Sequence, residues 1–109
     1  MNVISIISPR AQEDIDRHAD YIRAESIGAA ERFVDRVRDT VGWLRDQPAV
    51  GKPREFRSGR LAGLRSWPVS EFPNHLLFYH ANAERLLVVR VVHGARDLKQ
   101  AFRNRGSRR

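Results

Sequence analysis

Arginine and histidine are the residues of this 109-residue chain that could do chemistry. Eighteen of its 20 basic residues are arginine, whose planar guanidinium group can bind a carboxylate or a phosphate through two parallel hydrogen bonds. Three arginines stand within or just after apolar stretches and are candidates for such contacts: Arg65, Arg90 and Arg96. Histidine transfers protons near neutral pH, so His75, which opens an apolar stretch, is a candidate acid or base.

The spacing of the histidines argues against an acid–base pair within one strand. His75 and His80 are five residues apart and would face opposite sides of a regular strand, although His93 could join one of them across strands. We favour structural or exposed histidines and keep a catalytic histidine as the alternative. The chain has no cysteine, no cluster with the spacing of metal ligands, and no glycine-rich loop long enough to cradle a phosphate. We therefore expect neither a metal nor a cofactor.

The net charge of +7 is unevenly distributed along the chain. Residues 1–51 contain seven Lys/Arg and nine Asp/Glu, whereas residues 52–109 contain 13 and four. This asymmetry indicates a partner of negative charge, either an acidic protein segment or nucleic acid. Codon bias in a GC-rich genome, together with solubility, would explain many arginines, but not their concentration in one half.

Length and composition predict one compact domain, at residues 1–103, followed by a basic tail at residues 104–109 that we expect to be disordered. The hydrophobic content of 41% is typical of a globular protein. No apolar run approaches the roughly 18 residues of a membrane span, and the N-terminus lacks the pattern of a secretion signal. A cytoplasmic protein is expected.

The elements that must position these side chains begin with a short strand at residues 2–7 and two amphipathic helices. Ser8 supplies a helix-capping oxygen, and Pro9 suits the first helical position because it needs no hydrogen-bond acceptor. Ser26 is a candidate cap for the second helix. Apolar residues recur at helical spacing in both segments. They are Ala11, Ile15, Ala19 and Ile22 in the first, and Ala30, Phe33, Val34, Val37, Val41 and Leu44 in the second, at residues 29–46.

Three further strands, at residues 64–69, 75–80 and 86–93, are predicted to form an antiparallel meander, followed by a short helix at 97–103. Turns are expected at 71–74 and 81–84, and a loop at 49–63. Pro68 cannot donate to a ladder, so its strand needs an edge position or a bulge. The order β-α-α-β-β-β predicts an α+β fold, with the helical hairpin on one face of a small, mainly antiparallel sheet and the other face open.

The strand at residues 86–93 is mostly apolar on both sides, which indicates a central position. Regular alternation would place Leu87, Val89, Val91 and His93 on one face. Arg90 lies among valines and must reach water, pair with an acid such as Glu71 or Asp97, or bind a partner.

Tryptophan is the other residue type that could mark a contact. Trp43 and Trp67 are more often core residues in such positions, but Trp67 beside Pro68 on an edge strand could anchor a peptide.

Four short motifs follow one another along the chain: Ser8-Pro9-Arg10-Ala11, Ala29-Ala30-Glu31-Arg32-Phe33, Gly63-Leu64-Arg65-Ser66-Trp67-Pro68-Val69 and Val91-Val92-His93-Gly94-Ala95-Arg96-Asp97. In the order and spacing of these motifs, the chain resembles the RelE/ParE family of bacterial type II toxin–antitoxin toxins, and most closely the ParE branch. The resemblance runs from about Val3 to Phe102. It implies a toxin neutralised by an antitoxin encoded beside it. ParE-like members are described as poisons of DNA gyrase, and RelE-like members cleave mRNA on the ribosome.

The RelE-like site implied by the resemblance has lysines on the second strand, an arginine opening the third, an arginine after the fourth and a tyrosine in the last helix. Arg96 matches the arginine after the fourth strand, and His75 occupies the place of the arginine that opens the third. Phe102 stands where the tyrosine would be and has no hydroxyl, and the second strand has Arg65 but no lysine. The resemblance therefore favours binding over cleavage.

We predict a ParE-like, non-enzymatic toxin that inhibits DNA gyrase by binding and is neutralised in a hetero-oligomer with a cognate ParD-like antitoxin. The alternatives are a RelE-like mRNA endonuclease using His75 and Arg96, and a basic nucleic-acid-binding module without toxin activity; direct nucleic-acid binding is secondary in the main hypothesis. The residues expected at partner contacts are Arg65, Trp67, Arg90, Arg96, Phe102 and Arg103.

Overall fold

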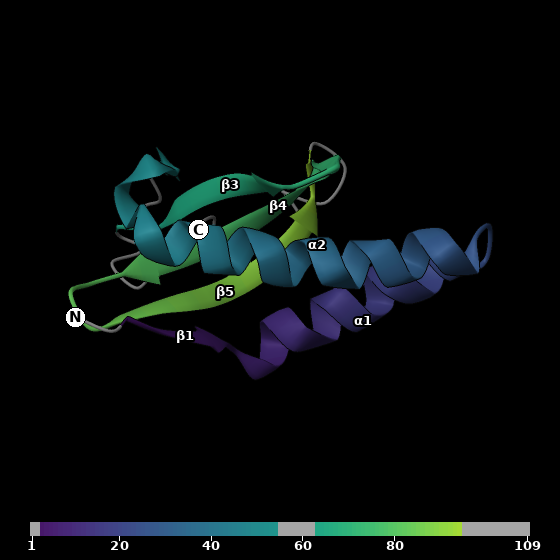
Figure 1. Cartoon of the computed structure of the whole chain (residues 1–109), viewed down its shortest axis with the longest axis horizontal. Coiled ribbons are helices and arrows are strands. Elements are labelled where there is room, and N and C mark those ends of the chain that lie inside the picture. The colour runs from purple at the N-terminus through teal and green to yellow at the C-terminus, as the bar shows by residue number, and fades with distance from the viewer. Residues whose placement is uncertain (1–2, 55–62, 95–109) are drawn as a thin grey trace, which may run out of the picture.

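The computed structural model describes residues 3–54 and 63–94 (Figure 1). The predicted C-terminal helix at 97–103 and the tail at 104–109 lie outside these residues. The elements, in chain order, are β1 (Ile4–Ile7), α1 (Pro9–Arg23), α2 (Ile27–Asp46), the 3-10 turn η1 (Pro48–Val50), β2 (Lys52–Pro53), β3 (Arg65–Val69), β4 (Phe72–Ala81) and β5 (Arg85–His93).

A five-stranded sheet in the order β1-β5-β4-β3-β2 forms one layer, and the hairpin of α1 and α2 forms the other (Figure 1). β3, β4 and β5 form the predicted antiparallel meander, and β2 extends it with a short antiparallel pairing to β3. β1 pairs with β5 in parallel, so the sheet is mixed but mainly antiparallel. This architecture confirms the α+β fold expected from the order of elements.

The helix starts follow the predicted capping chemistry. The Ser8 hydroxyl accepts a hydrogen bond from the Ala11 N–H at 3.0 Å, and Pro9 follows as the first helical residue. Ser26 caps α2 in the same way, through the N–H of Ala29, so α2 begins two residues earlier than predicted. In each case a side-chain oxygen satisfies an N–H group that the first helical turn leaves without a partner.

The main hydrophobic core lies between the hairpin and the sheet. Both predicted helical stripes enter it, because residues three and four apart lie on one side of a helix. Buried residues of this core are Ala11, Ile15, Ala19, Phe33, Val37, Val41, Leu44, Val69, Leu77, Tyr79, Leu86, Val88 and Val91.

The opposite face of the sheet is not open at its centre, contrary to the expectation. Leu64, Phe78 and Val92 form a second buried cluster there, each at most 1% exposed. Phe78 lies between Leu77 and Tyr79, which both belong to the main core, and successive side chains of a strand point to opposite faces. On the edge strand β1, whose Ile7 packs against the main core, Ile4 and Ile6 are 62% and 37% exposed.

The turn between β3 and β4 is shorter than predicted, and β4 is longer. The chain turns at Ser70 and Glu71, whose φ of 67° is left-handed, and β4 already begins at Phe72. Pro73 suggested a loop, but a register shift in the β3–β4 ladder lets Val69 pair with Phe72, and Pro73 has no ladder partner among residues 3–54 and 63–94. A proline is tolerated at such a position because no hydrogen bond is lost.

The sequence predicted an edge position or a bulge at Pro68, and the structure has an irregularity of the β3–β4 ladder there. The register of β3 against β4 shifts between Pro68 and Val69, and β2 pairs only with Arg65 and Ser66. The Arg54 N–H donates to Leu64 O on the side of β3 that faces away from β4. Alternate residues of a strand present their backbone groups to the same side, so those of Pro68 also point away from β4. The missing N–H of Pro68 therefore costs no bond to β4.

The regular alternation predicted for β5 is wrong beyond Val88. Tyr79 pairs with Val88 and Phe78 pairs with Arg90, so Val89 is an extra residue in the ladder. Such a bulge reverses the alternation of the residues that follow it. Val91 consequently faces the main core, whereas Val89 packs with the second cluster.

Candidate functional site

Arg90 forms a buried ion pair with Asp14 of α1. Its Nε donates to Asp14 Oδ2 over 2.7 Å and its Nη2 to Asp14 Oδ1 over 3.1 Å, a bidentate arrangement. The side chain of Arg90 is 11% exposed and that of Asp14 is 0% exposed. A charge so removed from water requires a partner, and each of these groups supplies one for the other. The pair therefore joins α1 to β5.

The same carboxylate also binds the backbone of β5. Asp14 Oδ2 accepts a hydrogen bond from the Val91 N–H at 2.9 Å, just beyond Val88, where the pairing of β1 with β5 ends. The sequence had suggested Glu71 or Asp97 as the acid that pairs with Arg90. Glu71 instead contacts Arg32 and Arg36 of α2. Asp97 lies outside the described residues.

His75 and His93 are brought together across β4 and β5, as the sequence allowed. They are paired in the ladder, and their ring centroids are 5.1 Å apart. His18 of α1 packs edge-on against His75 at 4.8 Å, and its Nε2 donates to Val91 O at 3.2 Å. Phe33 of α2 lies 4.9 Å from His75. The arrangement packs aromatic rings against both helices.

The other histidine of β4 lies apart from this cluster. His80 follows the core residue Tyr79 and therefore faces the other side of the sheet, as its five-residue spacing from His75 predicted. Within residues 3–54 and 63–94, no group of three His, Cys, Asp or Glu side chains could hold a metal ion.

Arg65 and Tyr79 stabilise the connection between α2 and β2. Arg65 Nη1 donates to the carbonyl oxygens of Ala49 and Gly51, at 3.2 and 2.8 Å. The Tyr79 hydroxyl donates to Pro48 O at 2.7 Å and accepts from the Gly51 N–H at 3.0 Å. Burial raises the pKa of Tyr79 above its ordinary value of 10.0, although the Gly51 hydrogen bond and the charge of Arg65 act in the opposite direction. This hydroxyl is therefore held in its neutral, donating form.

Trp67 lines a groove between α2 and the end of β3, which we call the tryptophan groove. Its ring packs against that of Trp43 on α2, with centroids 5.3 Å apart and planes inclined by 31°. The groove has a volume of about 580 Å³. It is lined by Asp39, Thr40, Trp43, Trp67, Pro68, Val69, Ser70, Glu71 and Pro73.

Polar contacts fix the walls of the tryptophan groove. Thr40, only 4% exposed, accepts a hydrogen bond from the Ser70 N–H at 3.0 Å and donates to Arg36 O at 2.6 Å. Arg36 of α2 pairs with Asp39 on the same helix and with Glu71 of the β3–β4 turn. These contacts hold the β3–β4 turn against α2.

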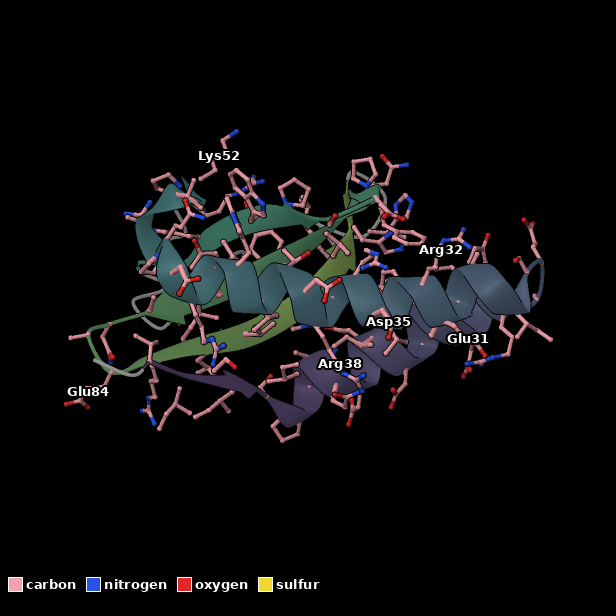
Figure 2. All side chains as sticks on the ribbon, viewed as in Figure 1. Glu31, Arg32, Asp35, Arg38, Lys52 and Glu84 are labelled. Atoms are coloured by element: carbon pink, nitrogen blue, oxygen red, sulfur yellow. The ribbon has the colours of Figure 1, made fainter. Side chains whose placement is uncertain are left out.

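The charged residues of α2 lie on two sides of the helix. Figure 2 shows Arg32 on the side towards the β3–β4 turn, and Glu31, Asp35 and Arg38 on the side towards α1. Arg32 Nε lies 4.0 Å from a carboxylate oxygen of Glu71, a long and exposed contact. The end of the groove beside this turn is therefore surrounded by charges of both signs.

The remaining predicted contact residues, Arg96, Phe102 and Arg103, lie outside the described residues. The described residues contain 12 Lys/Arg and 11 Asp/Glu, so +6 of the net charge of +7 belongs to residues 1–2, 55–62 and 95–109. None of the described helices is both long enough and apolar enough to cross a membrane.

Comparison with known proteins decides the family. The family model described as the ParE toxin of the type II toxin–antitoxin system parDE matches residues 6–98. This chain belongs to the ParE toxin family. A solved structure titled "Chromosomal ParDE TA system from P. aeruginosa" matches the fold with a TM-score of 0.68 at 16% sequence identity, covering 84% of this chain and 96% of that one. No curated protein matches the sequence.

In this ParE-family chain, sequence reasoning missed Asp14 and Thr40 as determinants of the structure. Asp14 stood among acidic residues near a helix start, where negative charge is common. A signal was nevertheless present, because Asp14 and His18 fall at helical spacing on the stripe that contains Ala11 and Ile15. A charged residue on a stripe that is otherwise apolar predicts a buried partner.

Proposed function

We propose that this chain is a ParE-type toxin that acts in the cytoplasm by binding DNA gyrase, and that a cognate ParD-like antitoxin neutralises it in a hetero-oligomer. The match of the ParE toxin model to residues 6–98 carries the proposal. It is supported by the fold shared with a chain of a ParDE system.

The state of the candidate residues supports action by binding. Arg90 is engaged by Asp14, and Arg65 donates to backbone carbonyl groups, so both guanidinium groups serve the fold. Most of the positive charge belongs to residues 55–62 and 95–109, which include Arg96 and Arg103. We assign the gyrase contact to these basic segments, because a concentrated positive charge favours association with an acidic surface.

One observation favours the second candidate, a ribosome-dependent mRNA endonuclease. The rings of His75 and His93 lie 5.1 Å apart, and two neighbouring imidazoles can act as general base and general acid. The chain lacks a lysine on β3, so stabilisation of the phosphorane-like transition state would depend on arginine.

Adding the purified protein to separate gyrase supercoiling and mRNA translation reactions tests the two candidates. We expect loss of supercoiling with intact mRNA, and the same result with His75→Ala, because histidine takes no part in binding gyrase. Arg103→Ala should weaken inhibition, with the matched arginine Arg10→Ala, on α1, as control. Cleaved mRNA whose cutting rate falls in His75→Ala would contradict the proposal and establish the endonuclease.

A further inference from the structure

The two edge strands of the sheet differ in how well they are protected against pairing with another chain. β2, at one edge, consists only of Lys52 and Pro53, a charged residue and a residue without an N–H. A short strand, a lysine and a proline each discourage the addition of a further strand. β1, at the other edge, has the sequence Ile-Ser-Ile-Ile and none of these features beyond its short length. The β1 edge can therefore accept another strand.

The backbone of β1 presents hydrogen-bonding groups to the outside of the sheet. The Ser8 N–H, just after the strand, donates to Val88 O of β5 at 3.0 Å. Since alternate residues present their backbone groups to the same side, those of Ser5 and Ile7 point away from β5. Among the strands that the structure describes, none lies beyond β1 to bind them. These groups form a template for a ladder.

Two isoleucines of β1 add an apolar surface to this edge. Ile4 and Ile6 are 62% and 37% exposed, and they alternate with Ile7, which packs against the main core. Ile6 is paired with Leu87 of β5, which is itself partly exposed. A row of apolar side chains along an edge that can still form a ladder is a surface that proteins normally cover.

A second copy of β1 complements this edge in both backbone and side chains. If two β1 strands pair antiparallel about a twofold axis at Ser5, the outward backbone groups of Ser5 in the two copies bind each other. Ile4 of each copy then lies directly opposite Ile6 of the other, at a position where Cα atoms are about 4.5 Å apart and side chains pack closely. One register therefore covers all four isoleucines. β1 has no charged side chain, so this pairing sets no like charges against each other within the two strands.

We propose that two copies of this chain associate through β1, antiparallel about a twofold axis at Ser5, so that their two sheets become one. The assembly closes at the dimer, because the edge that remains free is the protected strand β2. Since the paired strands are short, the dimer is weak and forms only at high protein concentration. The inference goes beyond the proposed function and does not depend on the target of the toxin.

Sedimentation equilibrium of the full chain tests the association. The average mass of the wild-type protein should rise above the 12.6 kDa of the monomer between about 10 μM and about 1 mM, the range of weak contacts. Ser5→Pro removes an outward N–H that β5 does not use, and Ile6→Lys places a charge at the apolar contact. Each should raise the dissociation constant about tenfold or more. The matched control Ile27→Lys, at a 64% exposed isoleucine of α2, should change it less than about twofold.

Disulfide cross-linking tests the register. The chain has no cysteine, so Ser5→Cys allows a single disulfide, between the two copies. Directly opposed residues of a hydrogen-bonded antiparallel pair have Cα atoms about 5.5 Å apart, within the span of a disulfide. With oxidised glutathione, Ser5→Cys should form a covalent dimer about tenfold faster than Ile27→Cys at the same concentration, because pairing holds its thiols together. Equal rates would contradict the proposed register.

Thermal unfolding of each variant distinguishes loss of contact from loss of fold, and Ile6→Lys decides the result if Ser5→Pro does not fold. A wild-type protein that stays monomeric at about 1 mM would overturn the proposal. A dimer that Ile6→Lys and Ser5→Pro leave unchanged would also overturn it. A monomeric toxin that loses its antitoxin in Ser5→Pro would overturn it too, and would assign the edge to a strand of the antitoxin.

Discussion

The helical hairpin packs against the sheet along two seams, one between α1 and β5 and one between α2 and β3. The two seams differ in which side chains they bury and which they leave exposed. Between α1 and β5, Asp14 and Arg90 are buried against each other, and His18 donates to the strand backbone. Between α2 and β3, Trp43 stays 42% exposed above Trp67, and the carboxylates of the rim face water. The charged residues are inside one seam, and the large apolar residues are left open in the other.

The comparison teaches that residue type alone does not distinguish a binding residue from a structural one. Arginine is common at interfaces, yet Arg90 is used to join α1 to β5. Tryptophan is usually covered, yet Trp43 lies at the surface. We therefore expect substitutions in the α1–β5 seam to affect folding most, and substitutions in the α2–β3 seam to affect partner binding.

The largest effect on stability should come from Asp14→Ala, which leaves the Arg90 guanidinium buried without its carboxylate. We expect a loss of about 3–5 kcal/mol in the free energy of unfolding, measured by urea denaturation. The matched control, Asp16→Ala, removes an exposed carboxylate of the same helix and should cost about 0.5 kcal/mol or less. Equal costs for the two variants would show that the buried pair does not stabilise this seam.

A smaller effect is expected from Tyr79→Phe, at the end of the sheet beside η1. Without the hydroxyl, the Pro48 carbonyl and the Gly51 N–H both lose their partner, at a cost of about 1–3 kcal/mol. Because the pKa of Tyr79 is raised in the folded state, the wild-type protein holds this proton more tightly than the unfolded chain does. Its stability should therefore fall as pH rises above 10.0, the ordinary pKa of tyrosine.

Chemical denaturation of both proteins on either side of that pH provides the measurement. The decline in stability should be shallower in Tyr79→Phe, which has no hydroxyl to titrate at this position. The same slope in both proteins would mean that other groups cause the alkaline decline.

The smallest effect on folding is expected from Trp43→Ala, in spite of the size of the side chain removed. Its ring is partly in water and packs mainly against Trp67, so the loss should be about 1 kcal/mol, the worth of an aromatic pair. Urea denaturation, run beside Asp14→Ala, makes the comparison direct. A loss as large as that of Asp14→Ala would show that the α2–β3 seam is a structural core and not an open contact site.

The sequence by itself determined the features that depend on near neighbours. The caps at Ser8 and Ser26, the two apolar stripes and the meander were all predicted, because capping and alternation involve residues close together in the chain. The pairing of His75 with His93 could be anticipated only as one option, since it depends on the register of two strands.

Tertiary structure decided what depends on distant partners. The bulge at Val89 reversed the face of Val91, and the acid that pairs with Arg90 came from α1, 76 positions earlier in the chain. The tryptophan groove likewise exists only because α2 and β3 place Trp43 beside Trp67. A sequence pattern records which side chains are apolar or charged. Which of them meet depends on strand register and helix packing, and these are set by the free energy of the whole core.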